Sequence, residues 1–199
     1  MREILVLYYS QAGKTKTLAN YIARGINSID GVQARIRTVP KVSMICEQIE
    51  SPTPNSGDLY VENKDLVECI GLALGSPVRF GNMASSLKYF LDGTSNEWIM
   101  GSLVGKPATV FTASSSLHGG QESCLLSMML PLFHHGMILL GVPYTSGHLL
   151  KTTAGGTPYG VSHVSGIENL NKINDCEREL AILQGKYLAT TALKLYGDM

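Results

Sequence analysis

The first eighteen residues contain the clearest change of hydrophobic pattern in the chain. An apolar run from Ile4 to Tyr9 is unbroken and rich in residues that favour strands. After a short polar stretch, apolar residues return with the spacing of one helix face, at Leu18, Ala19, Ile22, Ala23 and Ile26. The pattern predicts a buried strand, a tight loop and a helix.

The same alternation continues to the end of the chain. The pattern predicts further strands at 32–39, 66–74, 107–112 and 137–142, and further helices at 84–91, 122–134 and 175–196. Strands that alternate with helices imply a parallel sheet with right-handed crossovers. We therefore expect one α/β domain over residues 1–199 with five parallel strands. Two polar stretches, at about 40–63 and 143–174, are interpreted as insertions, the first as a lid or a subunit contact.

The predicted loop after the first strand is suited to an anion. It carries the hydroxyls of Ser10 and Thr15 and a flexible Gly13 where a helix begins, and a helix start favours negative charge. The sequence Gly13-Lys14-Thr15 also suggests a nucleoside triphosphatase loop, but that motif needs a glycine where Tyr8 stands. We expect a monophosphate here, with an ordinary strand-to-helix turn as the alternative.

Two more polar loops follow predicted strands, at 75–83 and 113–122. In open α/β sheets, ligands bind outside the carboxyl ends of the strands. The glycines, proline and asparagine of the 75–83 loop favour a preformed turn whose amides face a planar ligand. No Gly-x-Gly-x-x-Gly follows the first strand, which argues against a dinucleotide site. Flavin mononucleotide (FMN) fits better, with its phosphate at the first loop and its ring against the others.

Composition excludes several other classes of function. Lys+Arg and Asp+Glu balance at 16 each, so we expect neither nucleic acid nor an anionic membrane as a partner. The four cysteines are scattered, and Cys69 and Cys124 lie in apolar runs, which indicates packing rather than redox or zinc chemistry. The adjacent His134 and His135 would point apart, so a shared metal is not expected. No signal peptide or membrane span is recognisable, and a cytoplasmic location is expected.

Six motifs give the chain a strong resemblance to the WrbA-type NAD(P)H:quinone oxidoreductases, over nearly its whole length. They are Val6-Leu-Tyr-Tyr-Ser10, Pro77-Val-Arg-Phe-Gly-Asn-Met83, Phe90-Leu-Asp92, Gly119-Gly-Gln-Glu122, His134-His-Gly-Met137 and Gly155-Gly-Thr-Pro-Tyr-Gly160. The resemblance implies a flavodoxin-like three-layer sandwich with sheet order 2-1-3-4-5 and helices on both faces. It also implies one FMN per subunit, a homotetramer, and two-electron transfer from NADH or NADPH to quinones. If both substrates use the same face of the flavin, they bind in turn, with ping-pong kinetics.

The resemblance also assigns site residues. The phosphate would be held by Ser10, Gln11, Ala12, Gly13, Lys14 and Thr15. The isoalloxazine edge would be held by Pro77, Val78, Arg79, Phe80, Gly81 and Asn82. The ribityl chain and ring would be contacted by Ser114, Ser115, Ser116, Leu117, His118 and Gly119. His134 would hydrogen-bond the flavin, and Trp98 would cover the open face where substrates stack, in a neighbouring subunit's site. No side chain is expected to act as a nucleophile, because the hydride chemistry belongs to the cofactor.

Two departures from the family pattern affect these assignments. The first loop commonly reads Met-Tyr-Gly-His, and the tyrosine that is linked to nicotinamide binding is replaced here by Ala12, a substrate-binding position. The third loop is usually richer in glycine and one residue shorter than Ser114–His118. Weaker nicotinamide binding would favour a flavodoxin-type electron carrier reduced by a partner protein, although flavodoxins are typically acidic. A third hypothesis is an interaction subunit that has kept the fold. The sequence identifies neither the quinone nor the preferred nicotinamide nucleotide.

Overall fold

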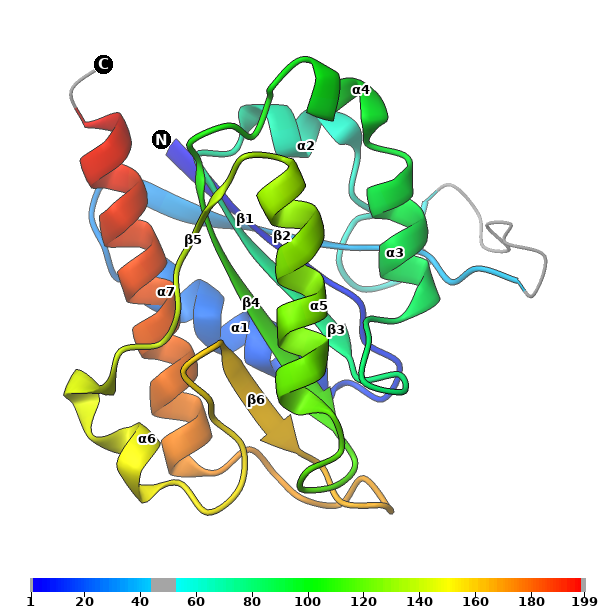
Figure 1. Ribbon diagram of the computed structural model, residues 1–199, viewed down its shortest axis with the longest axis vertical. Helices are drawn as coiled ribbons and strands as arrows, with labels where there is room; N and C mark the ends of the chain where they lie inside the picture. The colour runs from blue at the N-terminus through cyan, green and yellow to red at the C-terminus, as the bar shows by residue number, and fades with distance from the viewer. Residues whose placement is uncertain (1, 44–52, 198–199) are drawn as a thin grey trace.

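A parallel sheet with helices on both faces forms the centre of the computed structural model, which describes residues 2–43 and 53–197 (Figure 1). The strands are β1 (Arg2–Tyr8), β2 (Val32–Thr38), β3 (Gly71–Pro77), β4 (Pro107–Ser114), β5 (Ile138–Leu139) and β6 (Val161–Val164). The helices are α1 (Lys14–Ile26), α2 (Asn63–Glu68), α3 (Ser85–Asp92), α4 (Ser95–Ile99), α5 (Gln121–His134), α6 (His148–Lys151) and α7 (Asp175–Tyr196), with a 3-10 turn at Tyr144–Ser146. Part of the first predicted insertion, residues 44–52, lies outside the described residues.

The strand order β2-β1-β3-β4-β5 confirms the predicted order, and every pairing is parallel. The sheet also has a strand that the sequence pattern did not predict. β6 pairs with β4 from Phe111 to Ser114, whereas β5 pairs only with Pro107 and Ala108. Both strands therefore lie along the same edge of β4, and the segment between them interrupts that edge. The stretch 143–174, expected to be a polar insertion, thus contains part of the sheet.

The predicted strand at 137–142 is correspondingly too long. The amide of Leu140 still donates to the carbonyl of Ala108 at 2.8 Å, but the amide of Val142 donates to the carbonyl of Pro158 at 2.9 Å. The chain therefore leaves β4 after Leu140 and pairs with the segment that returns to β6. The apolar pattern of residues 137–142 does not show where the chain changes from one pairing strand to another segment.

Two hydrophobic cores, one on each face of the sheet, make the three layers. In β1, Ile4 and Val6 belong to the core shared with α1 and α7, whereas Leu5 and Leu7 belong to the core shared with α2, α3 and α5. A strand buried on both faces reads as a continuous apolar run, which explains the pattern at the start of the chain.

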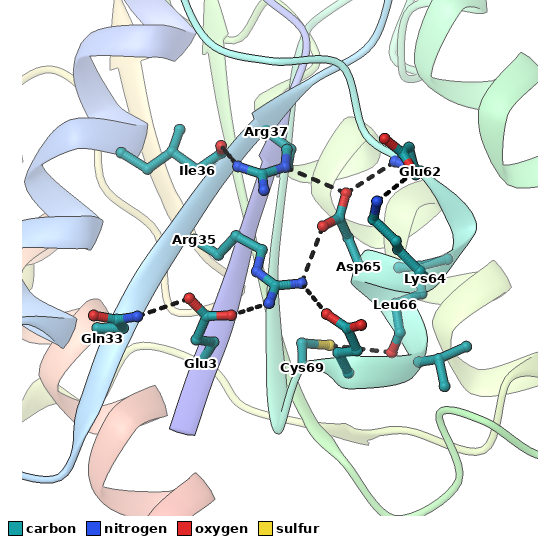
Figure 2. Close-up of polar contacts among 12 residues, drawn as sticks. Glu3, Gln33, Arg35, Ile36, Arg37, Glu62, Lys64, Asp65, Leu66 and Cys69 are labelled. Carbon is teal, nitrogen blue, oxygen red and sulfur yellow. Dashed lines mark hydrogen bonds and ion pairs between the residues drawn. The ribbon is translucent and has the colours of Figure 1, made fainter. Parts of the chain in front are cut away.

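The first third of the predicted strand at 66–74 is wrong, because residues 63–68 form α2. Asp65 explains this (Figure 2). Its carboxylate accepts the backbone N–H of Glu62 at 2.9 Å, which closes a capping box at the start of the helix. The same buried carboxylate pairs with Arg35 at 3.0 Å and Arg37 at 3.3 Å on β2. A helical turn presents Asp65 to both arginines, and these polar contacts outweigh the strand-like apolar pattern.

The structure buries the two cysteines that were expected to be packing residues. Cys69 and Cys124 are buried free thiols, and burial raises the pKa of both, that of Cys124 to about 11. Cys46 lies outside the described residues. Within residues 2–43 and 53–197, no helix is both long and apolar enough to cross a membrane. In the same ranges, no three His, Cys, Asp or Glu side chains are grouped as a metal site would require.

Candidate functional site

The loops after β1, β3 and β4 meet at one end of the sheet (Figure 1). They enclose a cavity of about 270 Å³. Among its lining residues are ten of the predicted positions: Ser10, Gln11, Ala12, Lys14, Thr15, Pro77, Val78, Arg79, Ser114 and Ser115. The structure thus brings together three loops that are far apart in the sequence, at the place where open α/β sheets bind ligands.

The first loop provides an anion site at the start of α1. Gly13, with φ of 84°, precedes the helix and has no side chain to cap it, so among the described residues no side chain caps the first amides of α1, whose N–H groups stay available. Thr15 is buried in the first turn. The hydroxyl oxygen of Ser10 is buried and has no hydrogen-bond partner within the described ranges. An unsatisfied buried hydroxyl costs about 1–3 kcal/mol, so a bound anionic oxygen would remove that cost. These features fit a phosphate monoester.

Two cationic side chains of the cavity bind neighbouring loops. The Lys14 ammonium donates to the carbonyl of Asn171 at 2.7 Å. The Arg79 guanidinium donates to the side chain of Gln11, and to the carbonyl of Val78 at 2.9 Å. Both side chains therefore join loops to each other, while their charge still makes the cavity favourable for an anion.

The second loop contains a tight turn from Arg79 to Asn82. The two residues exchange backbone hydrogen bonds of 2.8 and 2.9 Å, and both residues between them have positive φ, 51° at Phe80 and 76° at Gly81. A turn of this kind suits glycine, but a bulky residue at positive φ is strained by about 1–3 kcal/mol. Phe80 is also fully exposed. A strained and exposed aromatic side chain next to Arg79, which lines the cavity, is a candidate for binding.

The third loop is held by its own hydrogen bonds and touches the second loop at one point. The carbonyl of Ser116 accepts from the Ser114 hydroxyl at 2.9 Å and from the Gln121 amide at 2.7 Å. A β-carbon placed on Gly120 would lie 2.9 Å from the Cα of Gly81, so the two loops touch through their backbones. The sequence placed Gln121 in a motif but gave it no role in the site.

A fourth loop, which the sequence analysis missed, completes the cavity. Ser165, Gly166, Ile167 and Asn169 line it directly after β6. The Ser165 amide donates to the carbonyl of Ser114 at 2.8 Å, and the Asn169 side chain donates to the carbonyl of Ala12 at 3.4 Å. The available signal was the short segment Val161-Ser-His-Val164 between Gly160 and Gly166, whose two valines are residues that favour strands.

The remaining predicted positions do not line this cavity. Gly13 borders an adjacent hollow, and Asn82 borders another that also contacts Gln11 and Arg79. The others in the second and third loops are Phe80, Gly81, Ser116, Leu117, His118 and Gly119, which belong to loops whose other residues line the cavity. Their contact with a cofactor stays a prediction.

Trp98 and His134 lie together, but far from the cavity of their own subunit. Trp98 belongs to α4, where the pattern predicted only a loop, and its indole N–H donates to the carbonyl of His134 at 2.8 Å. α5 begins beside the third loop and ends at His134, so His134 is about 20 Å along the helix from the cavity (Figure 1). Neither residue lines this cavity.

A model of the NADPH-dependent FMN reductase family matches residues 3–148. The chain belongs to this family. This FMN reductase family member is 37% identical to the NAD(P)H dehydrogenase (quinone) of Chromohalobacter salexigens, over 99% of this chain and all of that protein. Among solved structures, it resembles a WrbA-like flavodoxin from Agrobacterium tumefaciens, with a TM-score of 0.68 and 20% identity over 98% of this chain and 99% of that one.

A flavodoxin from the domain Archaea has a TM-score of 0.63 and 17% identity to the same FMN reductase family member, over 96% of this chain and 98% of that one. The two structural likenesses establish the flavodoxin-like fold that the motifs predicted. With the family match and the curated relative, they confirm the resemblance to WrbA-type proteins.

Proposed function

We propose that the chain is an FMN-dependent NAD(P)H:quinone oxidoreductase. The observation that carries this proposal is the cavity at the strand ends, where the unpaired Ser10 hydroxyl and the start of α1 fit a phosphate monoester. Membership of the FMN reductase family and the likeness to a quinone dehydrogenase support FMN as the cofactor and NAD(P)H and a quinone as the substrates.

Different residues around the cavity would bind different parts of FMN. Ser10, Thr15 and the first amides of α1 would hold the phosphate, and the loop from Pro77 to Asn82 would border the ring. The fixed dipoles of that loop, which the Arg79–Asn82 turn orients, would stabilise negative charge on the ring. Bound FMN supplies the hydride carrier, so no side chain of this chain needs to act as a nucleophile.

Both substrates would use the open side of the cavity. Gln11 and Ala12 are exposed at its rim, and Phe80 and Leu117 project from the neighbouring loops. A nicotinamide and a quinone that need the same face exclude each other, so the reaction would follow ping-pong kinetics. The small Ala12 leaves room at the rim rather than an aromatic surface for the nicotinamide.

The assembly would be a homotetramer in which Trp98 and His134 serve a neighbouring site. α4 with its C-cap, and α5, carry large exposed apolar side chains, those of Trp98, Ile99, Met100, Leu126, Leu130 and Phe133. A surface of this kind is typical of a protein interface. Since Trp98 and His134 are about 20 Å from their own cavity, a subunit contact is what could bring them to an FMN.

An anaerobic spectroscopic experiment tests the function. The protein is mixed with FMN, then with NADH or NADPH, and finally with benzoquinone, while the visible spectrum is recorded. Bleaching by the nucleotide followed by recovery with quinone is expected. Bound FMN that neither nucleotide bleaches would favour an electron carrier reduced by a partner protein, and absence of FMN binding would contradict both functions.

A further inference from the structure

A buried, hydrogen-bonded pair of side chains outside the cavity joins β6 to the first turn of α7. His163 and Glu177 lie 2.9 Å apart, between Nδ1 of the ring and Oε2 of the carboxylate, and each side chain is only 1% exposed. Neither residue lines the cavity. Burying a carboxylate costs free energy unless the group is fully hydrogen-bonded. The hydrogen-bond partners of Glu177 therefore decide whether its burial is tolerated.

The Glu177 carboxylate accepts a hydrogen bond from each of four donors. Oε1 accepts the backbone N–H groups of Gly155 at 2.9 Å and Val164 at 3.4 Å. Oε2 accepts the N–H of Asn174 at 2.9 Å and Nδ1 of His163 at 2.9 Å. Burial alone would raise the pKa of Glu177, but the hydrogen bonds from His163, Asn174 and Gly155 outweigh it and lower the pKa. An ionised carboxylate can only accept hydrogen bonds. The proton between the two groups is therefore carried by Nδ1 of His163, which donates to Oε2 of Glu177.

Two of these donors are the ends of one loop. Val164 is the last residue of β6, and Asn174 is the cap of α7, so the carboxylate holds both ends of the segment 165–173. The backbone of Gly155 also lies so close to the carboxylate that no side chain would fit: a β-carbon on Gly155 would be 2.6 Å from Oε1 of Glu177. One side chain thus joins three separate segments of the chain.

The segment between these ends is the fourth wall of the cavity. Its residues Ser165, Gly166, Ile167 and Asn169 line the cavity, and the carbonyl of Asn171 holds Lys14 of the first loop. Ile167 is largely exposed, so burial of this apolar side chain does not fix the segment. A surface segment with few buried apolar contacts depends on its polar anchors for its position.

We propose that Glu177, together with His163, is a positioning residue for FMN. Its carboxylate fixes the segment 165–173 against the first and third loops, and the affinity for FMN depends on that wall. This inference rests on the proposed location of FMN in the cavity. The buried pair then shapes the cofactor site, although neither side chain touches the cofactor.

The first test compares Glu177→Gln with Glu179→Gln, the same change on the same helix at a side chain that is 43% exposed. In Glu177→Gln, the new side-chain amide would turn its N–H₂ group toward backbone N–H donors and leave buried donors unpaired. We expect FMN to bind at least about tenfold more weakly to Glu177→Gln, by quenching of FMN fluorescence, a loss of about 1.4 kcal/mol. Glu179→Gln should bind FMN like the parent protein.

Hydrogen exchange of the protein without FMN distinguishes a role of Glu177 in positioning the segment 165–173 from a role in the stability of the whole chain. Amides of residues 165–173 should lose more protection in Glu177→Gln than those of α1, whose loss should match only the fall in the global free energy of unfolding. A purely structural role would instead lower protection equally throughout the chain and leave FMN affinity unchanged at temperatures where the variant is folded. That second pattern would overturn the inference.

A pair of His163 variants provides an independent test if Glu177→Gln folds poorly. His163→Asn keeps an N–H donor close to the position of Nδ1, whereas His163→Leu removes it. We expect weakened FMN binding in His163→Leu and recovery of most of the affinity in His163→Asn. Equal FMN affinity in the two variants and the parent would contradict the proposal.

Ser10→Ala distinguishes failure of this inference from failure of the cofactor site. If Ser10→Ala weakens FMN binding but Glu177→Gln and His163→Leu do not, the inference is wrong and the site stands. If all three weaken it, both are supported. If Ser10→Ala has no effect, FMN binds elsewhere and the inference fails with the site.

Discussion

Gly185 on α7 lies directly against the backbone of Ile22 on α1. A β-carbon on Gly185 would be 2.1 Å from the carbonyl oxygen of Ile22. The contact is reciprocal, because a β-carbon on Gly25 would be 2.1 Å from the carbonyl oxygen of Ile182. The two helices that cover one face of the sheet therefore touch through their backbones. Both contacts lie in the second half of α1, toward its C-terminal end.

Gly185→Ala should destabilise the protein strongly. Overpacking a tight contact typically costs about 1–3 kcal/mol, and here a backbone must move, so we expect the upper end of that range. Lys186→Ala, at the exposed neighbouring position, should change stability by less than about 0.5 kcal/mol. Urea unfolding followed by circular dichroism measures both. Equal midpoints for the two variants would show that the helices can separate at little cost.

Ser10→Ala should weaken FMN binding without destabilising the protein that lacks FMN. The hydroxyl has no partner among residues 2–43 and 53–197 in the protein without FMN, so its removal relieves a buried unsatisfied group. Losing its hydrogen bond to a charged phosphate should cost about 1.5–3 kcal/mol, or at least roughly tenfold in affinity. Fluorescence titration and thermal unfolding measure the two effects. Ser28→Ala, beyond the other end of α1, is the control, and an equal loss of affinity there would contradict this assignment.

The sequence was sufficient for most of the sheet because burial on both faces leaves long apolar runs. The run Ile4–Tyr9 predicted β1 closely, and the loops after β1, β3 and β4 were recognised from the glycine, serine and threonine residues that follow each strand. In a parallel sheet these loops must meet at one end, so the location of the cavity followed from the topology.

The sequence was not sufficient where polar contacts or long-range pairing decide the structure. α2 depends on the contacts of Asp65 with two arginines from another strand, which no local pattern contains. β6 has four residues and pairs with β4 across a long interruption of the sheet edge. Because β6 was missed, the wall formed by Ser165 and its neighbours was missed as well.

Phe80→Asn should stabilise the protein that lacks FMN and impair its function. Asparagine tolerates a φ of about 51° better than phenylalanine does, so relief of strain should contribute about 1 kcal/mol. The loss of an exposed aromatic side chain at the rim should raise the KM for the quinone. Gly81→Ala is the contrasting variant, because its β-carbon would lie 2.8 Å from the hydroxyl of Ser123 and should destabilise the turn. A lower unfolding temperature in Phe80→Asn would contradict the strain argument.

Acid should remove the stabilising effect of Glu177. Burial would raise its pKa, but the hydrogen bonds from His163 and two backbone N–H groups outweigh burial and lower the pKa in the folded protein. The stabilisation is therefore complete above the unfolded value of about 4.3 and is lost as the pH falls from there through the folded pKa. The difference in unfolding free energy between the parent and Glu177→Gln should be constant from about pH 7 to 5 and shrink at lower pH. Urea unfolding across this range measures it, and a difference independent of pH would contradict the lowered pKa.

Leu130→Glu should break the assembly and so separate FMN binding from turnover. Leu130 is exposed on the apolar surface of α5, and a charge there cannot be buried in an interface without a partner. We expect the parent protein to have about four times the subunit mass of 21.5 kDa in light scattering, and Leu130→Glu a smaller mass. FMN binding should persist, because its cavity lies within one subunit, but quinone turnover should fall, because Trp98 and His134 would no longer reach a neighbour's site. The control is Leu150→Glu, at an exposed position on α6, which should change neither the assembly mass nor the quinone turnover. A mass of 21.5 kDa for the parent protein at micromolar concentration would contradict the tetramer.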